Sequence, residues 1–310
     1  MSMTQSVLIC DQVNPVLNEI LEKNGLQITY EPEITPEQIL EKIENFEVVI
    51  VRSRTKITKD MIEKATKCQI IARVGVGLDN IDQTAAKEKN IRVINAVEGA
   101  MNAVAELVIG LMLSLAREIP RADREVRNGN WIKKELMGSE LRGKYLGIVG
   151  LGNIGKRLGR LARALNMNII GYDVVPIDEE FSSEVGLMKA DLGTLLASSD
   201  YVSLHVPLLD STKHLINAEK MSTMKNTSRI INTSRGGVID EEALYEFLKD
   251  GKLGGAALDV FEVEPATSNN LATLPNFIST PHMGAQTKEA QSLAANVIAE
   301  KIIQILRGVT

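Results

Sequence analysis

A glycine pattern in the middle of the chain constrains the fold most. Gly150, Gly152 and Gly155 directly follow the apolar run YLGIV and precede a helical pattern. In a dinucleotide-binding βαβ unit, the first glycine makes a tight turn, the second lets a pyrophosphate approach the backbone, and the third lets the helix pack closely on the strand. The N–H groups and dipole of the helix that starts at Asn153 and Ile154 would favour the anion.

A carboxylate supports the dinucleotide interpretation. The next apolar run, NIIGYD, ends in Asp173, eighteen residues after Gly155. A carboxylate at this position can accept hydrogen bonds from the adenosine ribose and repels a 2′-phosphate, so the pattern predicts NAD rather than NADP. Two alternatives stay open at this point. The glycines could form an ordinary turn, and Asp173 could make a local contact at the end of its strand.

Short apolar runs alternate with helical patterns along the whole chain. The strands are expected at 7–10, 48–51, 69–74 and 92–95, and then at 145–150, 168–173, 201–206, 229–234, 256–261 and 276–280. Apolar strands separated by helices are typical of parallel sheets that are covered on both faces. Because 310 residues exceed the usual size of one hydrophobic core, we predict an α/β fold with two doubly wound parallel-sheet domains.

Two long helical patterns set the predicted domain boundaries. The first covers 101–119, with Pro120 as its stop, and the last covers about 288–306 with no strand after it. We expect this tail to pack back on the N-terminal region. The predicted domains are a discontinuous one, 1–98 with 285–310, and a nucleotide-binding one, 99–284. The apolar positions of the first helix are too dense for one face, which predicts a homodimer.

Composition argues against several classes of partner. With 35 basic and 40 acidic residues the net charge is −5, which offers no basic excess for nucleic acid. The apolar stretch 103–116 contains Glu106 and is shorter than the roughly 20 residues that cross a bilayer. The two cysteines, Cys10 and Cys68, lie in apolar runs and no export signal precedes them, so we expect a cytoplasmic protein. The three histidines are not clustered, and no metal site is expected.

Three residues in the last third of the chain suit chemistry on a 2-keto acid. They are Arg235 in NTSRGG, Glu264 in FEVEP and His282 in TPHMGA. A guanidinium can hold the carboxylate, an imidazole can protonate the carbonyl oxygen, and NADH can donate hydride, while Glu264 would stabilise the imidazolium. Simpler interpretations stay open, because Arg235 could cap a turn, Glu264 could be a solvated loop charge, and His282 could bond to the backbone.

Several ordered motifs resemble those of the D-isomer-specific 2-hydroxyacid dehydrogenases. They are VRSRTKIT, ARVGVGLDNID, the stretch from WIKKELMGSELRGK to GLGNIG, INTSRGGVIDEEAL, GAALDVFEVEP and PHMGAQTKEAQ, which span nearly the whole chain. The resemblance implies a Rossmann NAD-binding domain and a flavodoxin-like substrate domain, and it maps the family's catalytic residues onto Arg235, Glu264 and His282 in the cleft between them. It also implies NAD-dependent oxidation of 3-phospho-D-glycerate to 3-phosphohydroxypyruvate, which begins serine biosynthesis.

The resemblance assigns binding residues as well. The expected cofactor site comprises Gly150, Gly152, Asn153, Ile154, Gly155, Asp173, His205, Val206, Pro207, Thr233, Ser234, Arg235, Asp259, His282, Gly284 and Ala285, with Asp259 at the nicotinamide carboxamide. Val206 stands where related sequences often place a hydroxyl. The expected substrate site comprises Arg52, Ser53, Arg73, Val76, Gly77 and Lys133, whose cations suit a phosphate. Exposed surface charge is the alternative for Arg52 and Lys133.

Two rival functions stay open. A glyoxylate or hydroxypyruvate reductase needs the same chemistry without a phosphate site. An NAD-sensing protein of the corepressor type would bind the cofactor and show negligible turnover. Because the chain ends at Thr310, shortly after its last predicted helix, we expect no C-terminal regulatory domain and no feedback by serine.

Overall fold

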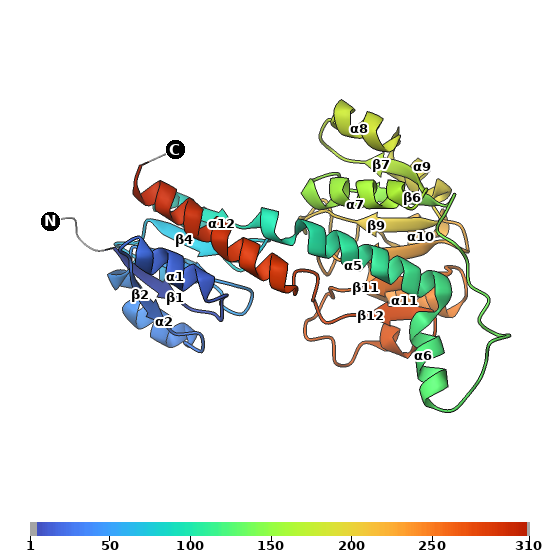
Figure 1. The fold of residues 1–310 in the computed structure, drawn as a ribbon, viewed down its shortest axis with the longest axis horizontal. Coiled ribbons are helices and arrows are strands. Elements are labelled where there is room, and N and C mark those ends of the chain that lie inside the picture. The colour runs from blue at the N-terminus through green and yellow to red at the C-terminus, as the bar shows by residue number, and fades with distance from the viewer. Residues whose placement is uncertain (1–4, 309–310) are drawn as a thin grey trace. The chain divides into compact units, whose positions relative to one another are not determined.

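The computed structural model describes residues 5–308, which fall into two compact units. The first unit contains the chain up to Met101 together with the segment from Ala285 onward, and the second is Asn102–Gly284. Each unit carries its own sheet, in which every pair of neighbouring strands is parallel (Figure 1). The predicted α/β class with two doubly wound parallel sheets is therefore confirmed.

The first unit contains five strands in the order β2-β1-β3-β4-β5. They are β1 (Ser6–Ile9), β2 (Gln27–Tyr30), β3 (Val48–Val51), β4 (Ile70–Arg73) and β5 (Arg92–Asn95). The helices are α1 (Val16–Lys23), α2 (Pro36–Lys42), α3 (Lys59–Lys64), α4 (Gln83–Glu88) and α12 (Lys288–Leu306), with a 3-10 turn, η1 (Ile43–Asn45). The strand order changes direction between β1 and β3, and open α/β sheets bind their ligands at such a point.

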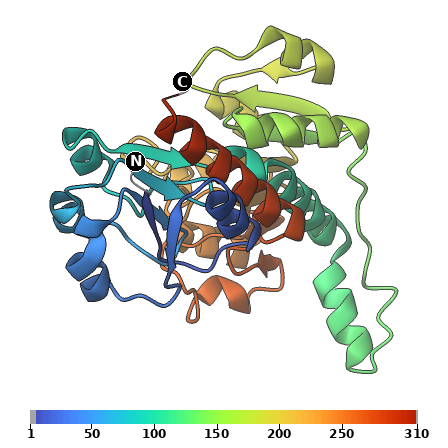
Figure 2. The same ribbon diagram turned by 60° about the vertical axis from the view of Figure 1, so that its left-hand side comes forward.

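Helices cover both faces of this sheet. On one face, α2, α3 and α4 bury side chains such as Ile39 and Ile62 against the strands. On the other face, Leu17 of α1 packs with Ile298 and Ile302 of α12, and the two helices lie side by side (Figure 2). All four residues of β3, VVIV, are buried because both faces are covered.

The second unit contains seven strands in the order β12-β11-β10-β9-β6-β7-β8. They are β6 (Tyr145–Val149), β7 (Asn168–Tyr172), β8 (Met188–Lys189), β9 (Tyr201–Leu204), β10 (Arg229–Asn232), β11 (Gly255–Leu258) and β12 (Phe277–Ser279). Besides most of α5 (Val97–Arg117), its helices are α6 (Ile119–Arg127), α7 (Asn153–Ala164), α8 (Glu179–Val185), α9 (Leu192–Ser198), α10 (Ala218–Ser222), α11 (Glu241–Lys249) and the 3-10 turn η2 (Asn270–Thr273). Here the order changes direction between β6 and β9.

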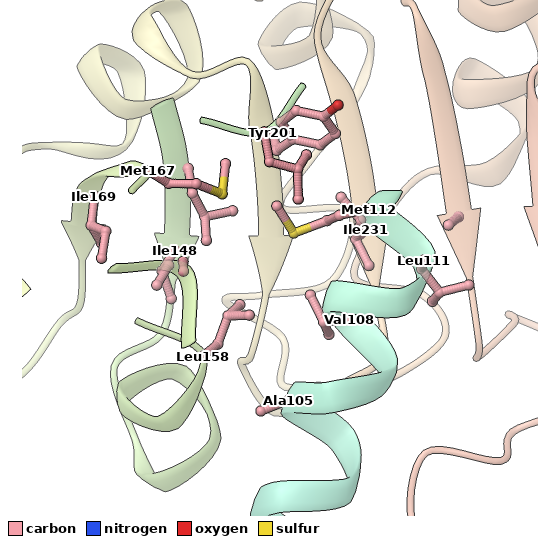
Figure 3. Packing of buried hydrophobic residues seen from close by; sticks show 14 of the residues in the cluster. Ala105, Val108, Leu111, Met112, Ile148, Leu158, Met167, Ile169, Tyr201 and Ile231 are labelled. Atoms are coloured by element: carbon pink, nitrogen blue, oxygen red, sulfur yellow. The ribbon is translucent and has the colours of Figure 1, made fainter. Parts of the chain in front are cut away.

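The long helix α5 forms part of the core of the second unit. Its side chains Ala105, Val108 and Met112 pack against Ile148 and Ile231 of the sheet (Figure 3). By length and composition alone α5 could cross a membrane, but 56% of its most apolar window is buried inside the protein. A core helix of a water-soluble domain passes the same test, so the finding is explained by packing.

Pro120 does not end α5 as the sequence suggested. The helix ends at Arg117, and Glu118 adopts a left-handed conformation with φ of 51°. Pro120 lies in the first turn of α6, where its missing N–H costs no helical hydrogen bond. The proline therefore starts the next helix.

Candidate active site

The glycine loop of the second unit joins β6 to α7 at the point where the strand order reverses. Gly150 has φ of 93°, a conformation that L side chains rarely adopt. A Cβ at Gly155 would lie 2.1 Å from the Gly150 carbonyl oxygen, so the helix could not approach the strand with any side chain there. Gly152 has no atom within 4 Å of its Cβ position, which leaves its backbone open to a ligand.

Asp173 supports the glycine loop directly. Its Oδ2 accepts a hydrogen bond from the backbone N–H of Leu151 at 2.6 Å, and its Oδ1 accepts one from Val175 at 3.1 Å. The local contact considered from the sequence is therefore present. Since the Oδ2 atom of Asp173 bonds to the glycine loop, Asp173 also fixes the backbone that would bind the pyrophosphate.

His205 lies beside this loop, just after β9. Its backbone N–H donates to Val149 O at 2.8 Å, and its Nε2 shares a 2.8 Å hydrogen bond with the hydroxyl of Ser203. Burial lowers the pKa of His205 to about 4, so the imidazole is neutral at neutral pH. A neutral ring held by Ser203 is compatible with the expected place of His205 in the cofactor lining. Ser203 is a partner that the sequence did not reveal.

The loop after β10 carries Thr233, Ser234 and Arg235. Buried Asn232 shapes it, because its Oδ1 accepts from the N–H and hydroxyl of Ser234 while its Nδ2 donates to Arg235 O at 2.8 Å. The hydroxyl of Thr233 is buried and has no hydrogen-bond partner in the described part of the chain. This hydroxyl is therefore available to form a hydrogen bond with a ligand.

A close backbone contact joins the segments of Arg235 and Glu264. A Cβ at Gly236 would lie only 1.8 Å from the carbonyl oxygen of Phe261, so this approach requires glycine. The two segments follow the neighbouring strands β10 and β11. The sequence motif NTSRGG thus brings its arginine next to the segment that holds the glutamate.

Glu264 and His282 form the ion-pair geometry that the catalytic hypothesis requires. His282 Nδ1 lies 2.8 Å from Glu264 Oε2, and the backbone N–H of Phe261 donates to the other carboxylate oxygen at 3.1 Å. Because an ionised carboxylate can only accept, Nδ1 donates the hydrogen bond to Glu264, and Nε2 takes no part in this contact. Both side chains remain partly exposed, at 48% for His282 and 38% for Glu264, so they are accessible.

Asp259 organises the loop that carries His282. Its carboxylate is buried and accepts from the Thr280 hydroxyl at 2.6 Å and from the N–H groups of Met283 and Gly284, each at 2.8 Å. His282 itself has φ of 52°, which these bonds on both sides help to hold. The residue expected at the carboxamide therefore also positions the histidine.

The remaining predicted residues occupy several places. Val206 and Pro207 follow His205 after β9, whereas Ala285 starts the second segment of the first unit. In that unit, Arg52 and Ser53 follow β3, Arg73 ends β4 and donates to Gly77 O, and Val76 O accepts from Asn95. Lys133 is exposed in the second unit, in the loop between α6 and β6.

The second unit fits a dinucleotide on its own residues. The glycine loop leaves the N–H groups at the start of α7 open, and the orphan hydroxyl of Thr233 lies after β10, two strands from β6. Among residues 5–308, no group of three or more His, Cys, Asp or Glu side chains could hold a metal ion. The arrangement therefore combines a nucleotide loop with a glutamate-supported histidine and an arginine.

Comparisons with known proteins agree with this geometry. The family model described as D-isomer specific 2-hydroxyacid dehydrogenase, NAD binding domain, matches residues 109–284. A hydroxypyruvate reductase of Thermotoga maritima is 46% identical over 290 residues, which cover 93% of each chain. The chain belongs to the D-isomer-specific 2-hydroxyacid dehydrogenase family. The family resemblance and the NAD cofactor expected from the sequence are thereby confirmed.

Other similar proteins are named for other substrates. A D-3-phosphoglycerate dehydrogenase of Methanocaldococcus jannaschii is 47% identical over 303 residues, which are 97% of this chain and 57% of that protein. The chain thus spans little more than half the length of this relative. The structure of D-lactate dehydrogenase from Escherichia coli matches 99% of this chain and 98% of its own with a TM-score of 0.85 and 29% identity. One fold thus serves several 2-hydroxy acids.

Proposed function

We propose that this protein is an NAD-dependent dehydrogenase that oxidises 3-phospho-D-glycerate to 3-phosphohydroxypyruvate, in the direction that begins serine biosynthesis. The observation that carries the proposal is the 2.8 Å contact between His282 Nδ1 and Glu264 Oε2, in the same unit as the glycine loop. The 47% identity with the M. jannaschii enzyme supports the choice of substrate.

The residues divide the work as follows. Arg235 holds the substrate carboxylate through its guanidinium, and His282 Nε2 accepts the proton of the C2 hydroxyl. Glu264 stabilises the imidazolium that results and keeps the ring in the tautomer with the proton on Nδ1. NAD, when bound, would be the acceptor for the hydride of C2. In the reverse direction His282 returns its proton to the carbonyl oxygen.

The first unit is proposed as the substrate domain. Arg52, Ser53, Arg73, Val76 and Gly77 follow or end neighbouring strands at the carboxyl edge of its sheet, where ligands bind. The forked guanidinium of an arginine suits a phosphate.

A hydroxypyruvate reductase is the second candidate, because the T. maritima relative of that name matches almost its full length. Initial rates with NADH separate the two. We expect kcat/KM for 3-phosphohydroxypyruvate to exceed that for hydroxypyruvate at least about tenfold, since each well-formed charged hydrogen bond to phosphate contributes about 1.5 to 3 kcal/mol. Equal or better use of hydroxypyruvate would reject the phosphorylated substrate. Turnover of no 2-keto acid would favour a cofactor-binding protein instead.

We also propose a cytoplasmic homodimer. The core of the second unit accounts for much of the apolar surface of α5, but Leu113, Ile119, Val126, Trp131 and Met137 on α5, α6 and the loop after α6 stay exposed. While α5 lies along the sheet, α6 and the loop after it project away from the sheet (Figures 1 and 2). A second copy would cover such a surface. Light scattering that gives the mass of one chain would contradict the dimer.

A further inference from the structure

The loop after β3 in the first unit carries two arginines with different surroundings. Arg52 and Arg54 are separated only by Ser53, so the sequence offers either guanidinium to an anionic substrate. The loop starts where the strand order reverses between β1 and β3, which is the ligand-binding position of an open α/β sheet. The hydrogen bonds of the two side chains distinguish their roles.

The guanidinium of Arg54 is bonded to acceptors of its own unit, although 47% of the side chain is exposed. Its Nε pairs with Oδ1 of Asp11 at 3.0 Å. Its Nη1 donates to Ile34 O at 3.2 Å, and its Nη2 donates to Cys10 O at 2.5 Å and Pro32 O at 2.7 Å. Four of the five N–H groups of the guanidinium are therefore engaged by protein acceptors.

Asp11 connects Arg54 to the backbone of the loop, because it binds both. It follows β1, is only 2% exposed, and accepts from the backbone N–H groups of Arg52 and Thr55 as well as from the Thr55 hydroxyl at 2.7 Å. A buried carboxylate is costly unless its oxygens are paired and hydrogen-bonded. Arg54 and the loop supply those partners, so Asp11 and the loop conformation depend on each other.

Asn80 holds the same segment from the other side. It lies in the loop after β4, and its Nδ2 donates to Arg52 O at 2.7 Å and to Thr55 O at 2.6 Å. The N–H groups of Arg52 and Thr55 are thus bound by Asp11 and their carbonyl groups by Asn80. The guanidinium of Arg52, in contrast, donates one hydrogen bond within the described residues, to Gln12 O at 3.1 Å.

We propose that Arg54, Asp11 and Asn80 are positioning residues that clamp the Arg52–Thr55 loop so that Arg52 and Ser53 face the substrate in a fixed conformation. This inference rests on the proposed function of the first unit as the substrate domain. A loop ordered before binding does not lose conformational entropy when the substrate arrives. Loss of the clamp should therefore raise KM for the substrate and leave the hydride-transfer step unchanged.

Steady-state kinetics of R54K and T55V test the clamp. The R54K variant keeps a positive charge near Asp11 but cannot form the fork, and the T55V variant removes one hydroxyl with little change in volume. We expect KM for 3-phosphohydroxypyruvate to rise about tenfold, which corresponds to about 1.4 kcal/mol, with kcat and KM for NADH unchanged within about twofold. The matched control is K56A, which removes an exposed cation from the same loop and should leave all three constants unchanged.

Hydrogen exchange measures the loop without using activity. In substrate-free protein, the amides of Arg52 and Thr55 should exchange at least about tenfold faster in R54K and T55V than in the wild type and K56A. The proposal is overturned if either KM or the exchange rate stays unchanged in both variants, or if K56A has the same effect as R54K. If the wild type reduces no 2-keto acid, the proposed function fails, and unchanged exchange would still overturn the clamp separately.

Discussion

The two sheets carry the loops proposed to bind ligands at equivalent points, where each strand order reverses, and the two loops are stabilised in opposite ways. In the second unit, the loop between β6 and α7 is shaped by missing side chains, because Gly150 and Gly155 fit where no Cβ could. In the first unit, the loop after β3 is held by the side chains of Asp11, Arg54 and Asn80. A pyrophosphate can bind to backbone N–H groups, whereas a small charged substrate needs cationic side chains that must themselves be held in place.

The largest expected effect concerns the chemistry in the second unit. H282A should lower kcat by about a hundredfold to ten-thousandfold, because a general acid–base residue contributes that much, while NADH affinity changes by less than about threefold. His214 provides a matched control, since it also pairs with a glutamate, Glu262, at 3.1 Å. H214A should retain kcat within about threefold in stopped-flow and steady-state assays. Equal losses in the two variants would contradict the assignment.

Alanine substitutions at two glycines of the loop between β6 and α7 should have different effects on stability. Gly155→Ala places a Cβ 2.1 Å from Gly150 O, so it should lower the free energy of unfolding by about 1 to 3 kcal/mol and weaken NADH binding more than about tenfold. Gly152→Ala meets no protein atom within 4 Å, so it should weaken NADH binding with unchanged stability. Denaturant unfolding and fluorescence titration measure both. A stable Gly155→Ala protein with normal NADH affinity would refute the loop geometry.

Two substitutions at Asp173 distinguish its effect on the preference for NAD over NADP from its support of the glycine loop. Asp173→Ala removes the acceptor of Leu151 N–H and the negative charge, so NAD should bind about tenfold more weakly and discrimination against NADP should relax. Asp173→Asn keeps an oxygen for Leu151 and removes only the charge. It should relax discrimination against NADP with a smaller loss of NAD affinity. Unchanged coenzyme preference in both variants, measured by initial rates, would exclude the ribose-binding role.

The neutral His205 predicts a pH dependence of stability. Burial lowers its pKa from 6.5 to about 4, so the unfolded chain binds a proton at higher pH than the folded protein does. The stabilisation is fully present above pH 6.5 and is lost as the pH falls towards 4. Between pH 7 and pH 5 this group should account for a loss of about 2 kcal/mol. His205→Gln should abolish that share of the slope in denaturant titrations, and an unaltered slope would show that other groups cause it.

The elements that repeat a strong local pattern could be predicted from the sequence. VVIV and YLGIV are continuous apolar runs and form β3 and β6. The edge strands β2, QITY, and β8, two residues long, were not predicted, because an edge strand is partly exposed and need not be apolar. The prediction that Pro120 stops the helix at 101–119 is wrong, because the left-handed Glu118 that separates α5 from α6 leaves no signal in the sequence.

The candidate site was likewise predictable only in part. The residue types of Glu264 and His282 suggested their chemistry, but their contact depends on the Phe261 N–H that bonds to Glu264 and on Asp259, which holds the loop of His282. Arg54 gave no signal of its role, because its acceptors are three backbone carbonyl groups and a buried carboxylate distant in sequence. The chemical roles of the site residues could be predicted from their side-chain types, whereas the contacts that position them could be seen only in the folded structure.

Hydride transfer tests the central claim most directly. The purified protein is incubated with 3-phosphohydroxypyruvate and NADH that carries deuterium on both C4 positions, and the product is analysed by mass spectrometry and on a chiral column. The account predicts 3-phosphoglycerate of the D configuration with one deuterium at C2, and none of this product with H282A. A product of the L configuration, a product without deuterium, or no product from the wild type would contradict the account.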